Sequence, residues 1–91
     1  MEVYRFIVTG RVQGVWYRKF VSRGAMKMRI EGYVKNLADK SVEVVAVLFD
    51  EDVEKFQKIL QDGSPISSVE SIDMTILDGD DLVYDGFEIR S

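Results

Sequence analysis

The sequence contains neither cysteine nor histidine, and only one proline among its 91 residues. Without cysteine the chain can form no disulfide and no thiolate nucleophile, a composition that fits a reducing compartment. Without histidine it cannot use a Ser/His/Asp triad, a phosphohistidine intermediate or a histidine-bound metal. Any catalysis must therefore rely on other side chains and on the backbone.

Long apolar runs are also lacking. No segment approaches the roughly 18 apolar residues that a membrane span requires, and the residues after Met1 do not resemble a signal peptide. The chain is 46% hydrophobic and 31% charged, which is typical of a folded globular domain. We therefore expect one domain covering residues 1–91, a cytoplasmic location, no membrane partner and a monomer.

The formal net charge of −4 is unevenly distributed. Residues 1–40 carry nine basic and three acidic side chains, whereas residues 41–91 carry three basic and thirteen acidic ones. A basic N-terminal part in an acidic protein favours a small anionic ligand, although scattered solvated charge explains the same counts equally well. An RNA-binding domain is an alternative, but it would need a basic face, so we expect no nucleic-acid partner.

Apolar periodicity predicts seven elements. Alternation predicts strands over residues 3–9, 32–37, 41–49, 69–77 and 84–90, with a turn at residues 79–81. Spacings of three and four predict a helix of about three turns from Tyr17 and a second helix that starts at the acidic residues 50–52 and ends near Gly63. The order is strand, helix, strand, strand, helix, strand, strand.

This order predicts an α+β fold. It is the ferredoxin-like βαββαβ sandwich with an extra C-terminal strand, in which an antiparallel sheet carries both helices on one face. The same architecture serves RNA binders, metal chaperones and small enzymes, so the function has to be argued from individual residues.

The junction between the first strand and the first helix, residues 10–18, reads GRVQGVWYR. Its two glycines allow the backbone to curl so that N–H groups point inward, and the start of a helix adds further free N–H groups. Arg18 lies in the first helical turn, from which its guanidinium can fork onto a phosphate. A surface arginine beside an ordinary loop is the alternative, and the spacing by itself favours it.

Residues 10–18 resemble the signature of the acylphosphatase family. A second signature of that family is similar to the stretch GYVKN at residues 32–36 together with DKSVE at residues 39–43. Residues 63–65 and 87–90 also resemble family positions, so the similarity extends over essentially the whole chain. The family hydrolyses acyl phosphates.

The resemblance implies specific roles. The loop backbone and Arg18 would bind the phosphate, and Asn36 would position the attacking water. The expected phosphate-binding residues are Val12, Gln13, Gly14, Val15, Trp16, Tyr17 and Arg18. The substrate would be a small acyl phosphate and the products a carboxylate and inorganic phosphate. The carboxylate leaves as an anion without a general acid, so we expect neither a metal nor a cofactor.

Two other functions remain open. The domain could bind an anion for regulation without turning it over, or it could be specialised for carbamoyl phosphate, as related domains in larger carbamoyl-transferring proteins suggest.

The acidic cluster of Asp78, Asp80, Asp81 and Asp85 suggests a calcium site, but it lacks EF-hand spacing, and a solvated loop is the better interpretation.

The chain departs from the family pattern at two positions. Arg29 and Lys40 stand where the family usually has glycine. Both positions favour a positive φ, which costs a residue other than glycine about 1 kcal/mol.

Overall fold

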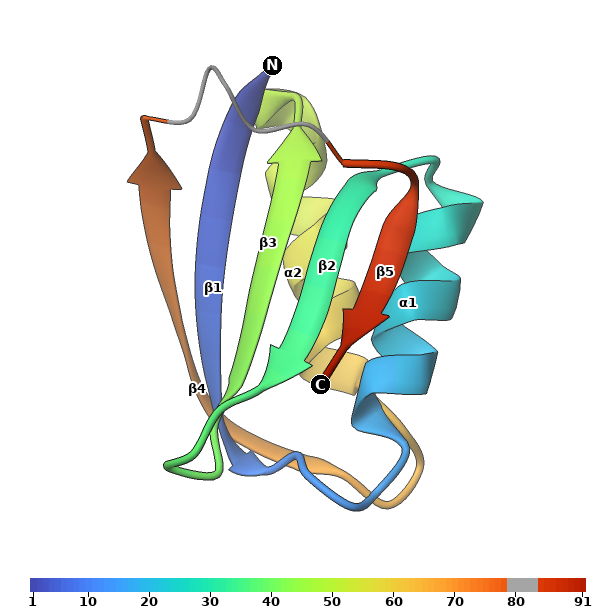
Figure 1. The fold of residues 1–91 in the computed structure, drawn as a ribbon, viewed down its shortest axis with the longest axis vertical. Coiled ribbons are helices and arrows are strands. Elements are labelled where there is room, and N and C mark those ends of the chain that lie inside the picture. The colour runs from blue at the N-terminus through green and yellow to red at the C-terminus, as the bar shows by residue number, and fades with distance from the viewer. Residues whose placement is uncertain (79–83) are drawn as a thin grey trace.

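The computed structural model describes residues 1–78 and 84–91. It contains a five-stranded sheet in the order β4-β1-β3-β2-β5, with two α-helices on one face (Figure 1). The strands are β1 (Glu2–Arg11), β2 (Glu31–Asn36), β3 (Val42–Leu48), β4 (Ser68–Leu77) and β5 (Phe87–Arg90), and the helices are α1 (Tyr17–Lys27), η1 (Asp50–Asp52) and α2 (Val53–Asp62). The expected βαββαβ fold with an additional strand is therefore confirmed.

The sheet differs from the expectation in one respect, because it is mixed rather than antiparallel. β1 pairs antiparallel with β3 and β4, and β2 pairs antiparallel with β3, but β5 pairs parallel with β2. β4 ends and β5 begins at the same end of the sheet (Figure 1). β5 must therefore run opposite to β4, and this is the direction of β2.

Two elements differ from those expected by more than one or two residues at an end, or in type. The acidic residues at the start of the second helix form the short 3-10 helix η1 before α2 begins. The last strand begins at Phe87, so residues 84–86 precede it instead of belonging to it. The turn expected at residues 79–81, and with it Asp80 and Asp81 of the acidic cluster, lies outside the described residues.

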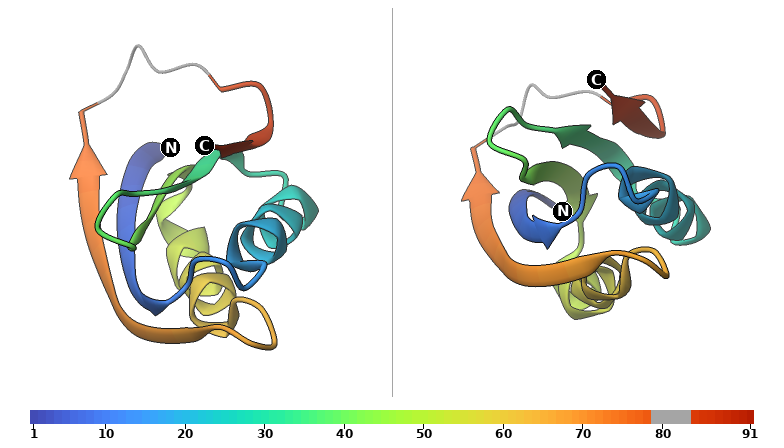
Figure 2. Two further views of the ribbon diagram at one scale, coloured as in Figure 1. Left: turned by 60° about the horizontal axis from the view of Figure 1, so that its bottom comes forward. Right: turned by 90° about the horizontal axis from the view of Figure 1, so that it is seen from below.

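The core lies between the sheet and the two helices, which cover the same face of the sheet (Figure 2). Strand alternation places every second side chain of β1 and β3 on this face, where aromatic and branched residues pack against α1 and α2. The ring of Phe6 lies 5.6 Å from that of Phe56, centroid to centroid. The largest fully buried side chains are those of Tyr4, Tyr17, Phe6, Phe56, Leu48 and Leu60. Burying each of the phenylalanine and leucine side chains stabilises the fold by about 1.5–3 kcal/mol.

Among the described residues, no helix is long and apolar enough to cross a membrane.

The fold places three connections at one end of the sheet: residues 12–16 between β1 and α1, residues 37–41 between β2 and β3, and residues 63–67 between α2 and β4. The candidate site lies at this end.

Candidate active site

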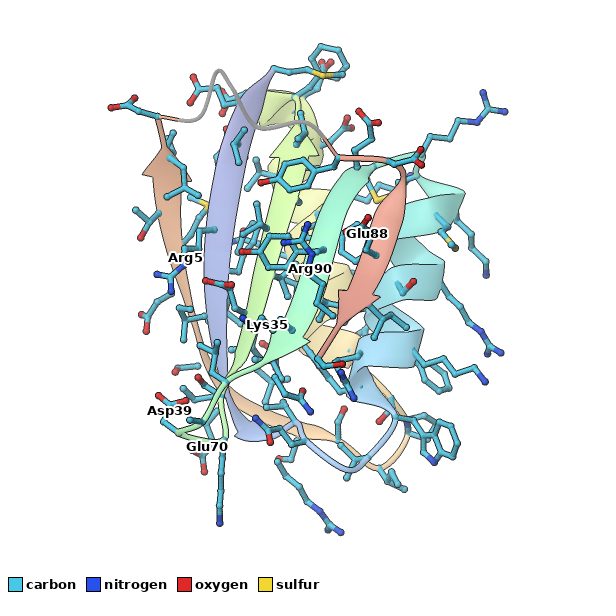
Figure 3. The ribbon with its side chains drawn as sticks, in the orientation of Figure 1. Arg5, Lys35, Asp39, Glu70, Glu88 and Arg90 are labelled. Carbon is cyan, nitrogen blue, oxygen red and sulfur yellow. The ribbon has the colours of Figure 1, made fainter. Side chains whose placement is uncertain are left out.

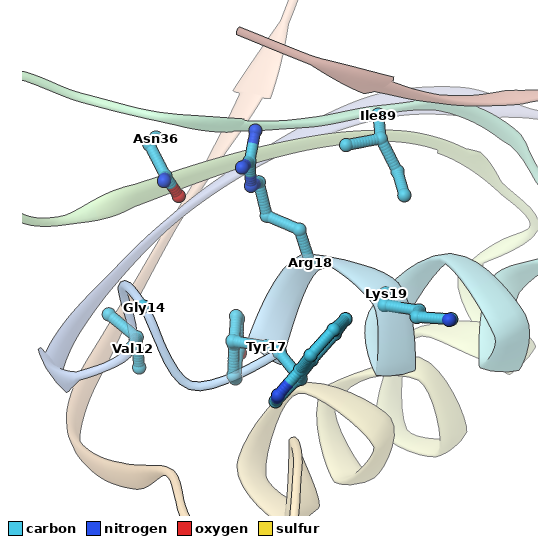
Figure 4. A pocket seen from close by; sticks show the side chains of 8 residues that line it. Val12, Gly14, Tyr17, Arg18, Lys19, Asn36 and Ile89 are labelled. Atoms are coloured by element: carbon cyan, nitrogen blue, oxygen red, sulfur yellow. The ribbon is translucent and has the colours of Figure 1, made fainter.

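A cavity of about 550 Å³ opens between the start of α1 and the end of β2 (Figure 4). Arg18 and Asn36 reach it from opposite elements, and the residues that complete its lining are Val12, Gly14, Trp16, Tyr17, Lys19 and Ile89. Residues from β5 and from the β1–α1 connection therefore meet at a single site, although more than 70 positions separate them in the sequence.

The β1–α1 connection curls around the cavity because two of its residues adopt left-handed backbone conformations. Gly14 has a φ of +72°, and a Cβ at that position would meet open space, so the backbone angle rather than packing favours glycine. Trp16, the residue before α1, has a φ of +65° and makes no side-chain capping bond. A left-handed tryptophan costs about 1 kcal/mol, and its conformation turns the chain into the helix.

The backbone N–H groups of residues 14–18 donate no hydrogen bond to any described residue. The first N–H groups of a helix have no partner within the helix, and here no side chain caps them. A cluster of free N–H groups beside an open cavity, at the partially positive end of α1, is suited to bind an anion.

Hydrogen bonds to two neighbouring connections hold the β1–α1 connection in place. The Gln13 side-chain amide donates to the backbone carbonyls of Leu37 and Ser41, 2.8 Å away in each case, and so ties the loop to the β2–β3 turn. The buried hydroxyl of Ser64 donates to the carbonyl of Val15. These bonds fix the loop from two sides.

Tyr17 anchors the start of α1. Its ring is buried and its hydroxyl donates to the carbonyl of Leu60 over 2.7 Å. Burial raises the pKa of this hydroxyl well above its usual value, so it stays protonated and keeps donating. Gly63 lies against the same ring, where a Cβ would approach it to 2.7 Å, and its φ of +53° also requires glycine. Only the backbone of Tyr17 is therefore free to face the cavity.

Arg18 extends from the first turn of α1 across the cavity (Figure 4). One of its terminal nitrogens, Nη1, donates to the carbonyl of Arg90 over 2.7 Å, which aligns the guanidinium. No other acceptor for its remaining N–H groups occurs in the described parts of the chain. Arg18 thus combines a fixed position with free donors.

Asn36 ends β2 and faces the cavity opposite the β1–α1 connection (Figure 4). Its side-chain oxygen Oδ1 is buried and lacks a hydrogen-bond partner, the one such side-chain atom in the described residues. A buried acceptor without a donor costs about 1–3 kcal/mol, and a ligand that supplies the donor removes this cost.

The turn after Asn36 is stabilised by Asp39. Its Oδ1 atom accepts a hydrogen bond of 3.0 Å from the backbone N–H of Ser41, and it also accepts one from the Ser41 hydroxyl. These bonds hold the pKa of the Asp39 carboxyl below its usual value. Lys40 in this turn has a φ of +75° and Arg29 a φ of +58°, so both non-glycine residues adopt the positive angles that we expected.

The structure brings together both predicted catalytic residues and five of the seven predicted phosphate-binding residues. Gln13 and Val15 do not line the cavity, because the Gln13 side chain is bonded to the β2–β3 turn and Val15 is buried. Sequence reasoning did not assign the cavity contacts of Lys19 and Ile89, although Lys19 directly follows the first signature and Ile89 belongs to a stretch that resembles the family.

The described residues contain no group of three or more His, Cys, Asp or Glu side chains placed to hold a metal ion. The cavity instead presents a guanidinium, free N–H groups and an amide oxygen. This arrangement can bind a phosphoryl group and one water molecule.

Known proteins are similar to this chain over nearly its full length. Residues 4–89 match the family described as Acylphosphatase. An acylphosphatase of Borrelia garinii subsp. bavariensis is 40% identical over 79 residues, which covers 86% of this chain and 85% of the relative. An acylphosphatase of Thiobacillus denitrificans is 37% identical over 91 residues, covering 100% of this chain and 99% of that one.

The fold agrees with a solved structure as well. The crystal structure of acylphosphatase from Bacillus subtilis superposes with a TM-score of 0.91 at 37% sequence identity, and the match covers all of both chains. The match of sequence and fold over nearly the whole chain shows that this chain belongs to the acylphosphatase family.

Proposed function

We propose that this protein hydrolyses acyl phosphates to a carboxylate and inorganic phosphate in the cavity between α1 and β2. One observation carries the proposal. The guanidinium of Arg18, the unbonded N–H groups of residues 14–18 and the buried, unpartnered Oδ1 of Asn36 converge on the same cavity. The family of the chain supports the same reaction.

The loop and Arg18 bind the phosphoryl group in this proposal. The N–H groups of the loop 12–18 and the positive end of α1 receive its oxygens, while Arg18 contributes a charged fork. These donors stabilise the charge that the transferring group spreads over its three oxygens in a loose transition state. The strained Trp16 and the cross-braced loop hold them in place before the substrate arrives.

Asn36 positions the water. Its Oδ1 accepts a proton of the water in a hydrogen bond, and its Nδ2 group donates to a phosphoryl oxygen. Asn36 is no base at neutral pH, so it orients the nucleophile without removing its proton.

The reaction is a direct displacement. A bond forms between the water oxygen and phosphorus while the bond from phosphorus to the acyl oxygen breaks, and that electron pair leaves on the carboxylate. A carboxylate with a pKa of about 4 needs no proton to depart. The proton of the water is left on the phosphate or passes to solvent. No metal, cofactor or phosphoenzyme is required by this chemistry.

We further propose that the protein acts as a monomer in the cytoplasm, without nucleic acid as a partner. The small size of the chain and its acidic net charge are compatible with a monomer. The cysteine-free composition is compatible with a reducing compartment.

The test is benzoyl phosphate hydrolysis by the purified protein in the presence of EDTA. We expect rapid turnover by the parent. Arg18→Ala should lower kcat/KM by about a thousandfold, and Asn36→Ala by about a hundredfold, because each removes a group that acts in the transition state. Asn36→Asp keeps the shape but adds a negative charge beside the phosphoryl group, so it should be no better than Asn36→Ala. Lys27→Ala, at the far end of α1, is the matched control.

Two results would contradict the mechanism: capture of a phosphoenzyme, or loss of parent activity with EDTA. A folded parent that binds phosphate but turns over no acyl phosphate would instead make the cavity a regulatory anion site.

A further inference from the structure

A second groove of about 410 Å³ adjoins the cavity and shares Trp16 and Lys19 with it. Its remaining walls are Val15 of the β1–α1 connection, Phe20 and Arg23 of α1, and residues 64–66 after α2. The proposed mechanism leaves this groove unused, since the phosphoryl group and the water both lie in the cavity.

The groove is built as a stripe along one helix. Lys19, Phe20 and Arg23 follow one another at spacings that place them on the same side of α1. Trp16 directly precedes the helix, and its ring lies against Lys19. Facing them is Ile66, which is 55% exposed, while Trp16 is 65% exposed. Two large apolar side chains thus remain open to solvent on opposite walls of one groove, where they can contact an apolar group.

Two cations lie over the aromatic rings of this stripe. The Lys19 ammonium is 5.3 Å from the centre of the Trp16 ring, and the Arg23 guanidinium is 5.7 Å from that of Phe20. Among the described residues, neither cation forms an ion pair, and no acidic side chain lines the groove. An apolar floor with unneutralised positive charge at its rim is complementary to an apolar group with an anionic end.

The geometry of the reaction directs the acyl group toward the groove. In an in-line displacement the leaving oxygen lies opposite the attacking water. Asn36, which would hold the water, and Lys19, which belongs to both hollows, lie at opposite ends of the cavity (Figure 4). The acyl group therefore leaves on the side where the groove begins.

We infer that the groove is the acyl subsite of the enzyme and that it favours an aromatic or extended apolar acyl group carrying a carboxylate at its far end. The acyl body lies between Trp16 and Ile66, and the distal carboxylate lies near Arg23. This inference rests on the proposed function, because it assigns the groove to the substrate of that reaction.

The experiment compares three substrates: acetyl phosphate, benzoyl phosphate and 4-carboxybenzoyl phosphate. Acetyl phosphate is too short to use the groove and reports on the phosphoryl site alone. Ratios of kcat/KM between substrates are then compared between variants, so that differences in intrinsic reactivity cancel. Ile66→Ser and Arg23→Gln change exposed side chains that do not line the phosphoryl cavity.

Ile66→Ser should lower the ratio of benzoyl to acetyl phosphate by about fivefold, the effect of a few methylene groups in an apolar pocket. Arg23→Gln should lower the ratio of carboxybenzoyl to benzoyl phosphate by about threefold, since an exposed ion pair contributes little more. Met26→Ser and Lys27→Gln, exposed on α1 outside the groove, are the matched controls and should leave both ratios unchanged.

Unchanged ratios in Ile66→Ser and Arg23→Gln, with acetyl phosphate hydrolysed at the parent rate, would overturn the acyl subsite and leave the proposed function standing. A parent that hydrolyses none of the three substrates would overturn the proposed function and the subsite with it. The rate with acetyl phosphate separates the two failures.

Discussion

Two polar regions of this small domain are built in opposite ways. The first lies on the sheet face that the helices leave open, where Figure 3 shows Arg5 and Arg90. We call it the outer cluster, and it consists of Arg5, Tyr33, Glu43 and Arg90. Glu43 accepts hydrogen bonds of 2.7 Å from the Arg5 Nε group and from the Tyr33 hydroxyl. The guanidinium of Arg90 lies 4.0 Å from the centre of the Tyr33 ring.

The charged groups of the outer cluster all have partners: Arg5 pairs with Glu43, and Arg90 pairs with Glu88. Burial opposes ionisation of Glu43, but the hydrogen bonds from Arg5 and Tyr33 outweigh it and hold the pKa of Glu43 below its usual value. Burial, together with the bond to Glu43, raises the pKa of the Tyr33 hydroxyl to about 12. The donors of Arg5 and Tyr33 are directed at Glu43, and those of Arg90 are directed at Glu88.

The second region is the cavity end of the sheet. There the polar side chains of Gln13 and Ser64 bond to backbone carbonyls of other loops, while the N–H groups of residues 14–18 and the Oδ1 atom of Asn36 have no partner among the described residues. The comparison teaches that bound polar groups hold a structure together, whereas unbound donors and acceptors that face a common cavity indicate a ligand site.

Of the variants that test this comparison, the one that releases the β1–α1 loop from the β2–β3 turn should lose the most catalytic activity. Gln13→Ala removes both hydrogen bonds to the turn that follows Asn36. We expect kcat/KM for benzoyl phosphate to fall about tenfold to a hundredfold, because small misplacements of positioned groups are costly. Activity should be measured beside the unfolding free energy, which we expect to fall by about 1–2 kcal/mol.

Gln13→Glu tests whether the amide donors matter rather than the volume of the side chain. Its carboxylate cannot donate to the two carbonyls, so it should be at least as impaired as Gln13→Ala. Gln57→Ala, another half-buried glutamine, located on α2, should retain full activity. Full activity of Gln13→Ala would show that the loop does not need this connection.

A smaller loss of activity is expected from the other side of the loop. Ser64→Ala leaves the carbonyl of Val15 without its donor. An unsatisfied buried acceptor costs about 1–3 kcal/mol, which thermal or urea unfolding would measure. Activity should fall only severalfold, since Gln13 still holds the loop.

Ser22→Ala is the matched control, because it also changes a buried serine but lies on α1 away from the loop. Equal destabilisation by Ser22→Ala and Ser64→Ala would show that the bond to Val15 has no special role.

The outer cluster should affect stability and leave catalysis unchanged. Because the pKa of Glu43 lies below its usual value in the folded state, its contribution is present above the unfolded pKa near 4.5 and is lost as the pH falls below that value. Glu43→Gln should therefore lower stability at pH 7 by no more than about 1 kcal/mol. It should also lose less stability than the parent between pH 5 and pH 3.

Urea unfolding at several pH values measures this difference, and benzoyl phosphate hydrolysis at pH 7 should be the same in both proteins. A large loss of activity in Glu43→Gln would mean that the two polar regions are coupled.

Much of the fold could be predicted from periodicity. Helical spacing located α1 and α2, and alternation located the strands, because each element buries one face. The parallel pairing of β5 could not be predicted, since alternation is the same in parallel and antiparallel strands and the pairing depends on where β4 ends. The 3-10 geometry of residues 50–52 was missed for a similar reason, because acidic residues start either kind of helix.

The sequence predicted the main residues of the site but not the contacts that hold them in place. Spacing indicated an anion-binding loop only weakly, and the resemblance to a family assigned roles to Arg18 and Asn36. The bonds of Gln13 and Ser64 were not predicted, because their partners lie 24 and 28 positions away for Gln13 and 49 for Ser64. Trp16 in a left-handed conformation was also missed, since nothing in a bulky aromatic residue suggests a positive φ.

The smallest expected effect concerns the β2–β3 turn, where the departure from the family pattern can be corrected. Lys40 has a φ of +75°, so Lys40→Gly relieves a backbone strain of about 1 kcal/mol while adding entropy to the unfolded chain. The net result should be a stabilisation of about 0.5 kcal/mol with unchanged activity. Ala38→Gly in the same turn, where φ is negative, receives only the entropic cost and should destabilise. Both variants introduce glycine into the same turn. Opposite signs of the change in unfolding free energy, measured with urea, would therefore isolate the effect of the backbone angle. Destabilisation by both would show that Lys40 bears no strain.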